Sequence, residues 1–231
     1  MVNALDLIDE TIADLEAKLG LKPGQSLPSS KGGEAPKKKN EKKKKQPNNN
    51  NNKKPPQSAP PTDQPDICKL DFRVGVITKV WVHPDADKLY CEEIDIGEKE
   101  GPRRIASGLR PHFTLEQMMG QRLLVVANLK AKNLVGFKSH GMVLCAANGD
   151  DTKVEFVEPP PEAPIGESVT FEGLPKPQPF SPSQVDKKKV FQACLKGMTS
   201  TDECLAAWNG HVFVTTAGPC RVQTIANGNL R

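Results

Sequence analysis

Two apolar segments joined by a lysine-bearing loop, between residues 122 and 147, constrain the fold more than any other part of the chain. Every second residue in them is apolar: Leu123, Val125, Ala127 and Leu129 in the first, and Met142, Leu144 and Ala146 in the second. A period of two is typical of strands with one face packed on a core. The two segments therefore predict neighbouring strands that hold the loop between them in solvent.

The loop between these strands combines basic and polar side chains with glycines that favour a turn. These residues are Asn128, Lys130, Lys132, Lys138 and Ser139, with Gly136 and Gly141. Rigid strands can aim such groups at a ligand, and OB-type barrels often bind single-stranded nucleic acid in this way. The loop is not a phosphate-binding P-loop, because that motif needs a contiguous Gly-Lys pair and a second glycine five residues earlier.

The order of the predicted elements indicates a five-stranded Greek-key barrel of the OB type over residues 66–172. A long strand over 70–82 has one consistently buried face, and further strands follow at 89–97 and 103–109. Residues 114–117 have the sequence of a helix capping box. Together with the two strands around the loop, these elements predict a mainly β domain.

The last part of the chain, residues 173–231, predicts a small α+β segment. Residues 190–195 place apolar side chains on one face of a helix. Asn209-Gly210 lies between two apolar runs, a strong hairpin signal, and a third run at 220–225 can pair with that hairpin. About 60 such residues are marginally stable alone, so we expect this segment to dock on the barrel.

Residues 1–20 predict a short amphipathic helix suited to binding a partner. Its apolar residues alternate between spacings of three and four: Leu5, Ile8, Ile12, Leu15 and Leu19. The same stretch carries five acidic residues and no apolar core, so it does not have the composition of a signal peptide. We therefore expect a cytoplasmic protein.

Residues 21–65 predict a disordered linker, because their Lys, Asn and Pro content cannot bury a core. Within it, residues 31–54 hold ten lysines and two glutamates, a net charge of +8, whereas the whole chain carries +4. Mobile lysines add sequence-independent affinity for RNA phosphates. The candidates for this auxiliary contact are Lys37, Lys38, Lys39, Lys42, Lys43, Lys44 and Lys45.

The sequence offers no catalytic or metal-binding constellation. The six cysteines show no C-x-x-C pair and no histidine at zinc-finger spacing, so we expect buried, reduced thiols. The four histidines are isolated and have no carboxylate or nucleophile at a recognisable spacing. No apolar run reaches the length of a membrane span. We expect a protein without enzymatic activity, metal, cofactor or membrane contact.

Several motifs in a fixed order resemble a known family. They are Leu70-Asp71-Phe72-Arg73-Val74-Gly75, His83-Pro84-Asp85-Ala86-Asp87-Lys88-Leu89-Tyr90, Ser107-Gly108-Leu109, Asn128-Leu129-Lys130, Asp202-Glu203-Cys204 and Cys220-Arg221-Val222-Gln223-Thr224. Over residues 68–231 the chain resembles the tRNA-binding OB domain of aminoacyl-tRNA synthetase cofactors, of the endothelial monocyte-activating polypeptide II type. The resemblance implies an accessory protein that binds tRNA and serves synthetases or a multisynthetase complex.

The resemblance also implies which residues contact RNA. The family uses the loop between strands four and five, which corresponds here to Asn128, Lys130, Lys138, Ser139 and Met142. This chain departs from the family pattern at two places. Ala131 stands where the family has a proline after the first lysine of the loop. The second basic residue of the loop comes one position earlier than in the family, as Lys132.

Two other functions stay open at this stage, a chaperone-like OB protein that binds peptides and a cytokine-like interaction protein. The lysine-rich linker favours RNA binding, because a chaperone gains little from phosphate neutralisation. The animal protein of the family that this chain resembles contains a cytokine-like peptide. In this chain the corresponding segment, residues 73–78, lacks one residue of that peptide. The leading hypothesis is therefore a non-catalytic tRNA binder.

Overall fold

The computed structural model describes residues 63–231. The helix predicted at 1–20, the lysines of the linker and nearly all of the linker itself lie outside the described residues. None of the helices between residues 63 and 231 is long and apolar enough to cross a membrane.

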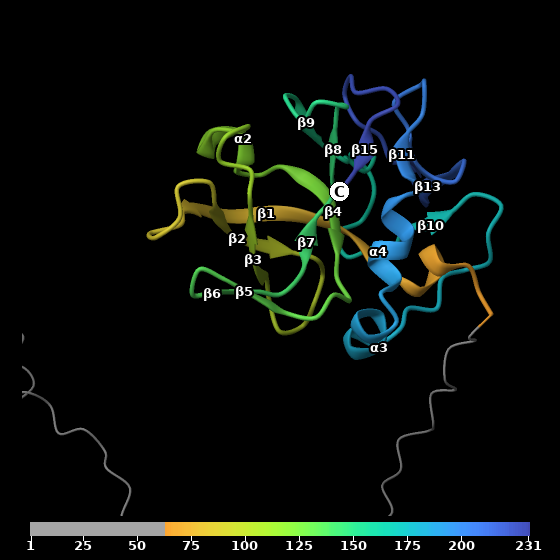
Figure 1. Ribbon diagram of the computed structural model, residues 1–231, viewed down its shortest axis with the longest axis horizontal. Helices are drawn as coiled ribbons and strands as arrows, with labels where there is room; N and C mark the ends of the chain where they lie inside the picture. Colours follow the sequence, from red (N-terminus) through yellow and green to blue (C-terminus); the bar gives the residue numbers. More distant parts are fainter. Residues whose placement is uncertain (1–62) are drawn as a thin grey trace, which may run out of the picture. The chain divides into compact units, whose positions relative to one another are not determined.

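A five-stranded antiparallel sheet curls into a nearly closed barrel (Figure 1). Its strands, in spatial order, are β3 (Arg103–Ser107), β2 (Tyr90–Asp95), β1 (Phe72–Val82), β4 (Arg122–Val126) and β7 (Met142–Val143). The residues that precede β7 approach β3, where the His140 N–H donates to the Arg104 carbonyl over 2.9 Å. This contact brings the two edges of the sheet together. The predicted mainly β, OB-like barrel is confirmed.

Two short helical turns flank the barrel strands. The 3-10 helix η1 (Asp66–Lys69) precedes β1, and α2 (Leu115–Met118) lies between β3 and β4. Thr114 and Gln117 form the predicted capping box of α2, each side chain meeting the other residue's backbone N–H. The sequence therefore located this helix correctly.

The prediction of one consistently buried face along residues 70–82 is wrong, because β1 contains a β-bulge. Its register against β2 shifts between Ile77 and Lys79. The extra residue, Thr78, is exposed, and both Ile77 and Val80 face the barrel interior. A bulge re-aims the side chains that follow it, so Lys79 and Trp81 lie on the outer face of β1.

Strand β4 is buried on both faces, not on one. Leu123 and Val125 belong to the core inside the barrel, whereas Leu124 and Val126 belong to a second core outside it. The predicted strand over residues 142–147 is likewise divided, into β7 and β8 (Cys145–Ala147). The division occurs because the chain leaves the barrel sheet at Leu144 and enters the next sheet.

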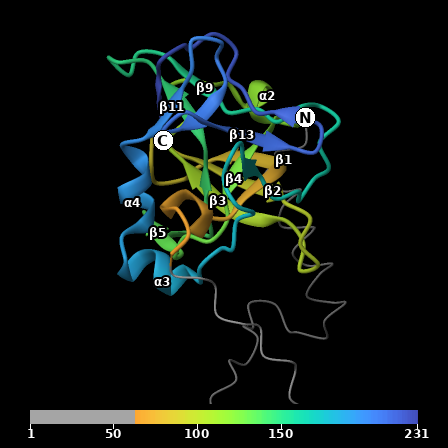
Figure 2. The ribbon, with the colours of Figure 1, turned by 90° about the vertical axis from the view of Figure 1, so that its right-hand side faces the viewer.

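The second sheet curls around one side of the barrel (Figure 2). In spatial order it contains β10 (Thr170–Phe171), β13 (His211–Thr215), β12 (Ala206–Trp208), β11 (Met198–Ser200), β15 (Asn229–Leu230), β8 and β9 (Val154–Phe156), and β14 (Gly218–Pro219) pairs with β13. The predicted hairpin is β12–β13, with Asn209 and Gly210 at positive φ. The run at 220–225 forms no strand and contributes only isolated bridges at Arg221.

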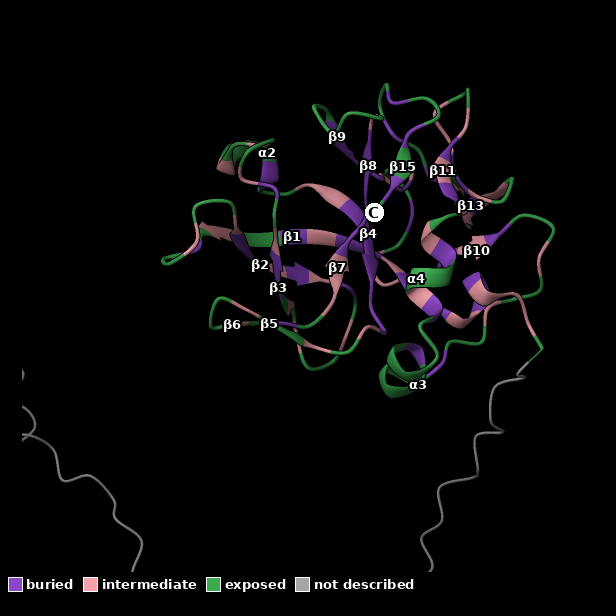
Figure 3. Cartoon of the chain, viewed as in Figure 1, coloured by how far each residue is buried: buried purple, intermediate pink, exposed green. Residues whose placement is uncertain are grey.

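Two helices complete this part, α3 (Pro182–Lys187) and α4 (Val190–Leu195). The second hydrophobic core joins them and the curled sheet to the outer face of β1 and β4 (Figure 3). The strands β8, β9 and β10 come from the region predicted as the barrel domain, yet β8 pairs with β15 and β10 pairs with β13, both from beyond residue 173. The division into domains at 172–173 stays a prediction.

Candidate nucleic-acid interface

The lysine-bearing loop contains a small hairpin of its own. Strands β5 (Lys132–Leu134) and β6 (Phe137–Ser139) pair across a turn at Val135 and Gly136, whose φ angles are 48° and 84°. Two consecutive positive φ angles are typical of a type I′ turn. The hairpin lies at the edge of the barrel beside β3 (Figure 1). It therefore presents its side chains from a defined backbone.

Asn128 is buried and its side chain is fully hydrogen-bonded within the protein. The amide nitrogen donates to the carbonyls of Lys69 and Phe180, over 2.9 and 3.0 Å. The side-chain oxygen accepts from the Asp71 N–H over 2.9 Å. These bonds tie together the start of β1, the end of β4 and the segment before α3. In this arrangement Asn128 holds the loop in place.

Ser139 is also buried, at 3% exposure. Its hydroxyl accepts from the Ala106 N–H and donates to the Gly141 carbonyl, both over 3.1 Å. The first bond fastens the hairpin to β3, and the second fixes the turn into β7. Ser139 thus fixes the position of the hairpin on the barrel.

The three lysines of the predicted site are exposed, but they do not converge on one point. Lys130 Nζ lies 3.6 Å from an Asp186 oxygen on α3, in an exposed pair that stabilises little. Alternate residues of a strand point to opposite faces, so Lys138 faces away from the side occupied by Phe137 and Ser139. Lys132 pairs with Ser139 in the hairpin.

Lys130 and Lys132 border a cavity of about 180 Å³ between the loop and the helices α3 and α4. Its apolar walls include Leu129, Met142 and Phe191. The structure therefore combines three of the predicted residues, Lys130, Lys132 and Met142, around one hollow with apolar walls, whose rim carries two lysines and one acid, Asp186. Such a hollow suits a ligand that has both an apolar face and negative charge.

A larger groove of about 580 Å³ extends from Lys130 toward β3. Arg103 borders it, but Glu98 binds this guanidinium through two contacts of 2.6 and 2.7 Å. The hydrogen bonds from Arg103 lower the pKa of the Glu98 carboxyl. Arg104 also borders the groove and is exposed. Among the residues described, Arg104 forms no ion pair, so its charge is available to a ligand.

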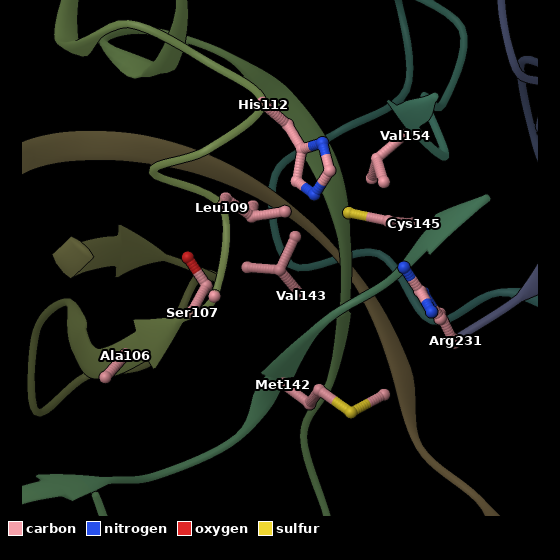
Figure 4. Close-up of a pocket in the computed structure, with 10 residues that line it drawn as sticks. Ala106, Ser107, Leu109, His112, Met142, Val143, Cys145, Val154 and Arg231 are labelled. Carbon is pink, nitrogen blue, oxygen red and sulfur yellow. The ribbon is translucent and has the colours of Figure 1, made fainter. Parts of the chain in front are cut away.

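A third cavity, of about 310 Å³, lies between β3, β7 and β8 (Figure 4). The side chains of Leu109, His112 and Cys145 converge on it, and Met142 lies at the end opposite His112 (Figure 4). Arg231 borders it and pairs with an Asp151 oxygen at 2.8 Å. Met142 is thus shared between this cavity and the one beside Lys130.

A buried acid lies behind this cavity. Glu92 accepts a hydrogen bond from Ser107, a residue that lines it. Burial raises the pKa of Glu92 to about 8, and the hydrogen bond from Ser107 opposes this rise only in part. The carboxyl is therefore mostly protonated at neutral pH and adds little negative charge that would repel an anionic ligand.

The cysteines behave as small apolar residues. All six are free thiols, and five of them are buried. Burial raises the pKa of Cys194 and Cys220 to about 12, so neither is a nucleophilic thiolate at neutral pH. Across residues 63–231, no three His, Cys, Asp or Glu side chains are grouped so that they could hold a metal ion.

The sequence alone did not indicate Arg104, His112 or Arg231 as members of these surfaces. The adjacent pair Arg103-Arg104 at the start of a predicted strand was a signal that could have located Arg104. His112 and Arg231 approach each other only through folding, because they are 119 positions apart in the sequence.

Comparison with known proteins gives a consistent result. Residues 72–168 match the family model described as "Putative tRNA binding domain". The "Probable methionine--tRNA ligase" of Oryza sativa subsp. japonica is 46% identical over 165 residues, which cover 71% of this chain and 20% of the relative. The "tRNA-aminoacylation cofactor arc1" of Schizosaccharomyces pombe is 40% identical over 169 residues, which cover 70% of this chain and 37% of the relative. The chain thus spans well under half the length of these curated relatives.

A solved structure of a related domain matches this chain over nearly the whole length of that domain. The crystal structure of the C-terminal domain of Plasmodium vivax p43 is 33% identical and superposes with a TM-score of 0.66. The match covers 71% of this chain and 98% of that domain. The likeness therefore extends over both the barrel and the curled sheet.

Proposed function

The chain belongs to the family of tRNA-binding domains of the endothelial monocyte-activating polypeptide II type, and on that premise we propose that it is a non-catalytic accessory protein that binds tRNA and retains or delivers it for aminoacyl-tRNA synthetases. One observation carries the proposal. Lys130, Lys132 and Arg104 lie exposed around hollows at one edge of a rigid barrel. Lysine and arginine at fixed positions are the groups that contact RNA phosphates.

The proposed interface assigns two different roles to the six residues of the loop. Lys130, Lys132 and Lys138 contact phosphates, and Met142 offers an apolar contact inside the hollow. The buried side chains of Asn128 and Ser139 act indirectly, since their hydrogen bonds fix the loop that carries the lysines. The interface thus recognises the shape of the RNA through lysines held at fixed places.

The linker supplies the second part of the proposed binder. Its net charge of +8 over residues 31–54 adds affinity for any RNA through counterion release. The proposed partners are tRNA and one or more synthetases in the cytoplasm. The arc1 relative, by its name, is a cofactor of tRNA aminoacylation, and this supports a role beside an enzyme instead of as one.

Filter binding of tRNA and of an unstructured RNA over a salt series tests this function. Replacement of both Lys130 and Lys132 by alanine is expected to weaken tRNA binding and to reduce the preference for tRNA. The matched control replaces Lys176 and Lys196, which are exposed and lie outside the three cavities described here. It removes the same charge. Equal loss of affinity in both double variants would show that binding depends only on net charge. That result would contradict a defined site at the loop.

A deletion of residues 31–54 separates the linker from the loop. This variant should lose affinity for both RNAs alike and show a flatter salt dependence, because it releases fewer counterions. It should retain its preference for tRNA. Failure of the full chain to bind tRNA at physiological salt would refute the proposed function as a whole.

A further inference from the structure

Two aromatic side chains lie outside both hydrophobic cores. The eleven Phe, Trp and Tyr residues of the chain all fall within residues 63–231. Nine of them belong to the two cores or pack against them, and Trp81 and Phe137 do not. Both are half-buried, and their rings meet edge-to-face with centroids 6.0 Å apart and planes at 67°. Their position at the surface therefore needs an explanation other than core packing.

Each ring carries a cation. Lys79 Nζ lies 5.2 Å from the centre of the Trp81 ring, and the guanidinium carbon of Arg104 lies 4.7 Å from that of Phe137. Both distances are within the range of cation–π attraction. Lys79 also lies 3.9 Å from Glu93, but the two side chains are 63% and 34% exposed, so this pair stabilises little. The net charge of this cluster is positive.

The cluster is built from three separate elements, which fixes its geometry. Trp81 and Lys79 lie on β1, Arg104 on β3 and Phe137 on β6. The β-bulge at Thr78 turns Lys79 and Trp81 to the outer face. The hydrogen bond from the Ala106 N–H to Ser139 holds β6 against β3. The rings and cations therefore lie on strands, and this hydrogen bond sets the position of Phe137 relative to Arg104.

We propose that Trp81 and Phe137 form a stacking platform for an unpaired nucleotide of the bound RNA, with Lys79 and Arg104 beside its phosphates. Aromatic faces flanked by cations are the means by which proteins bind single-stranded nucleic acid. The site is also continuous with the surface of the proposed function, because Arg104 and Lys130 border the same groove.

The charge of the cluster favours a nucleic acid over a protein partner. Two exposed cations lie on the rings themselves, and the only acid paired with them in the described structure, Glu93, is itself partly covered. This platform rests on the proposed tRNA-binding function and deepens it. Paired regions of tRNA would contact the lysines of the loop, and an unpaired base would contact the rings.

The fluorescence of Trp81 tests the platform directly. The chain contains two tryptophans, so Trp208→Phe in the full chain leaves Trp81 as the sole reporter. A short single-stranded oligoadenylate should quench and shift its emission, whereas a fully paired RNA duplex of equal length should not. In the same background, Phe137→Leu should weaken oligoadenylate binding about five- to a hundredfold, the usual effect of losing one stacked base.

A conservative variant separates loss of the platform from misfolding. Trp81→Tyr keeps an aromatic face and should keep most of the affinity for oligoadenylate, whereas Trp81→Leu should lose it, both measured by filter binding. In one outcome the Trp81 emission does not change with oligoadenylate, while tRNA binding still depends on Lys130 and Lys132. This result would overturn the platform and leave the proposed function standing. Absence of binding to tRNA as well would overturn both.

Discussion

The Glu155 carboxylate accepts two hydrogen bonds from Thr224, one from its hydroxyl over 2.6 Å and one from its backbone N–H over 2.8 Å. The Ile225 N–H donates to the same carboxylate over 3.0 Å, and Lys153 Nζ lies 2.9 Å away. Burial alone would raise the pKa of Glu155, but these donors outweigh it and lower the pKa to about 2. This single side chain fastens β9 to the last loop of the chain.

The pKa of Glu155 predicts a loss of stability in acid. The folded pKa lies below the ordinary value of 4.5, so the ionised carboxylate stabilises the fold above about pH 4.5. This contribution disappears as the pH falls from 4.5 toward 2. Glu155→Gln should lower the free energy of unfolding by about 2 kcal/mol at pH 7 and remove this part of the pH dependence. Urea unfolding between pH 2 and 7 measures both effects.

Glu162→Gln serves as the control for this experiment, since Glu162 is exposed. It should unfold like the unchanged protein at every pH. A difference between Glu155→Gln and the unchanged protein that stays constant from pH 7 to pH 2 would contradict the assignment.

Glu92 predicts the opposite pH dependence. Its folded pKa of about 8 exceeds the ordinary value of 4.5, so between these pH values the unfolded chain is ionised while the folded chain is protonated. Stability therefore falls as the pH rises from 4.5 to 8 and levels off above. Glu92→Gln should be more stable than the unchanged protein at pH 8, with the gap closing toward pH 4.5. Glu100→Gln, at an exposed site, should leave the profile unchanged.

Val135 occupies a strained backbone conformation at the tip of the β5–β6 hairpin. Its φ of 48° is unfavourable for a β-branched residue, whereas Asn tolerates this region and is favoured before Gly136. Val135→Asn should stabilise the protein by about 1 kcal/mol and raise its Tm by about 2–4 °C. Val135→Ile keeps the β-branch and should give no increase. Equal melting temperatures for the two variants would argue against strain at this turn.

The period of two in the sequence was enough to predict most strands of the barrel, because it reflects local packing on a core. The same pattern did not predict the places where the chain forms a bulge or passes from one sheet to another, because the composition does not change there. Thr78 has no sequence mark of a bulge, and Leu144 continues an apolar pattern although the chain passes there from one sheet to the other. These features depend on partner strands distant in sequence.

The same reason limited the prediction of the site. The sequence indicated the loop and its lysines, which the structure leaves exposed. It did not reveal that Asn128 is buried, since the N–H of Asp71, which donates to it, lies 57 positions earlier. Trp81 and Phe137 were likewise hidden, because their contact joins two strands that belong to different sheets, β1 and β6.

The role assigned to Asn128 leads to a fourth prediction. Asn128→Leu leaves the Asp71 N–H and the carbonyls of Lys69 and Phe180 without their partners. Buried groups left unpaired cost about 1–3 kcal/mol each, so the free energy of unfolding should fall by several kcal/mol. Any loss of tRNA binding should follow the loss of folded protein in circular dichroism. A variant that folds normally and yet fails to bind tRNA would instead assign Asn128 a direct contact.

The last prediction concerns the core between the barrel and the curled sheet. Phe72, Leu124 and Val126 have their side chains in this core, each with no more than 1% exposure. Ending the chain after Phe171 removes the helices and strands that cover this face and exposes a contiguous apolar patch, which is typical of an interaction surface.

The shortened chain should therefore bury that patch by associating with itself. Sedimentation velocity should show a dimer or larger species for residues 1–171, compared with the full chain at the same concentration. Leu124→Lys in the shortened chain places a charge on the exposed face and should shift the sample toward monomer, because burying an unpaired charge in an interface is unfavourable. A stable, folded monomer of the unaltered shortened chain would show that the helices and strands beyond Phe171 are not needed to cover the barrel.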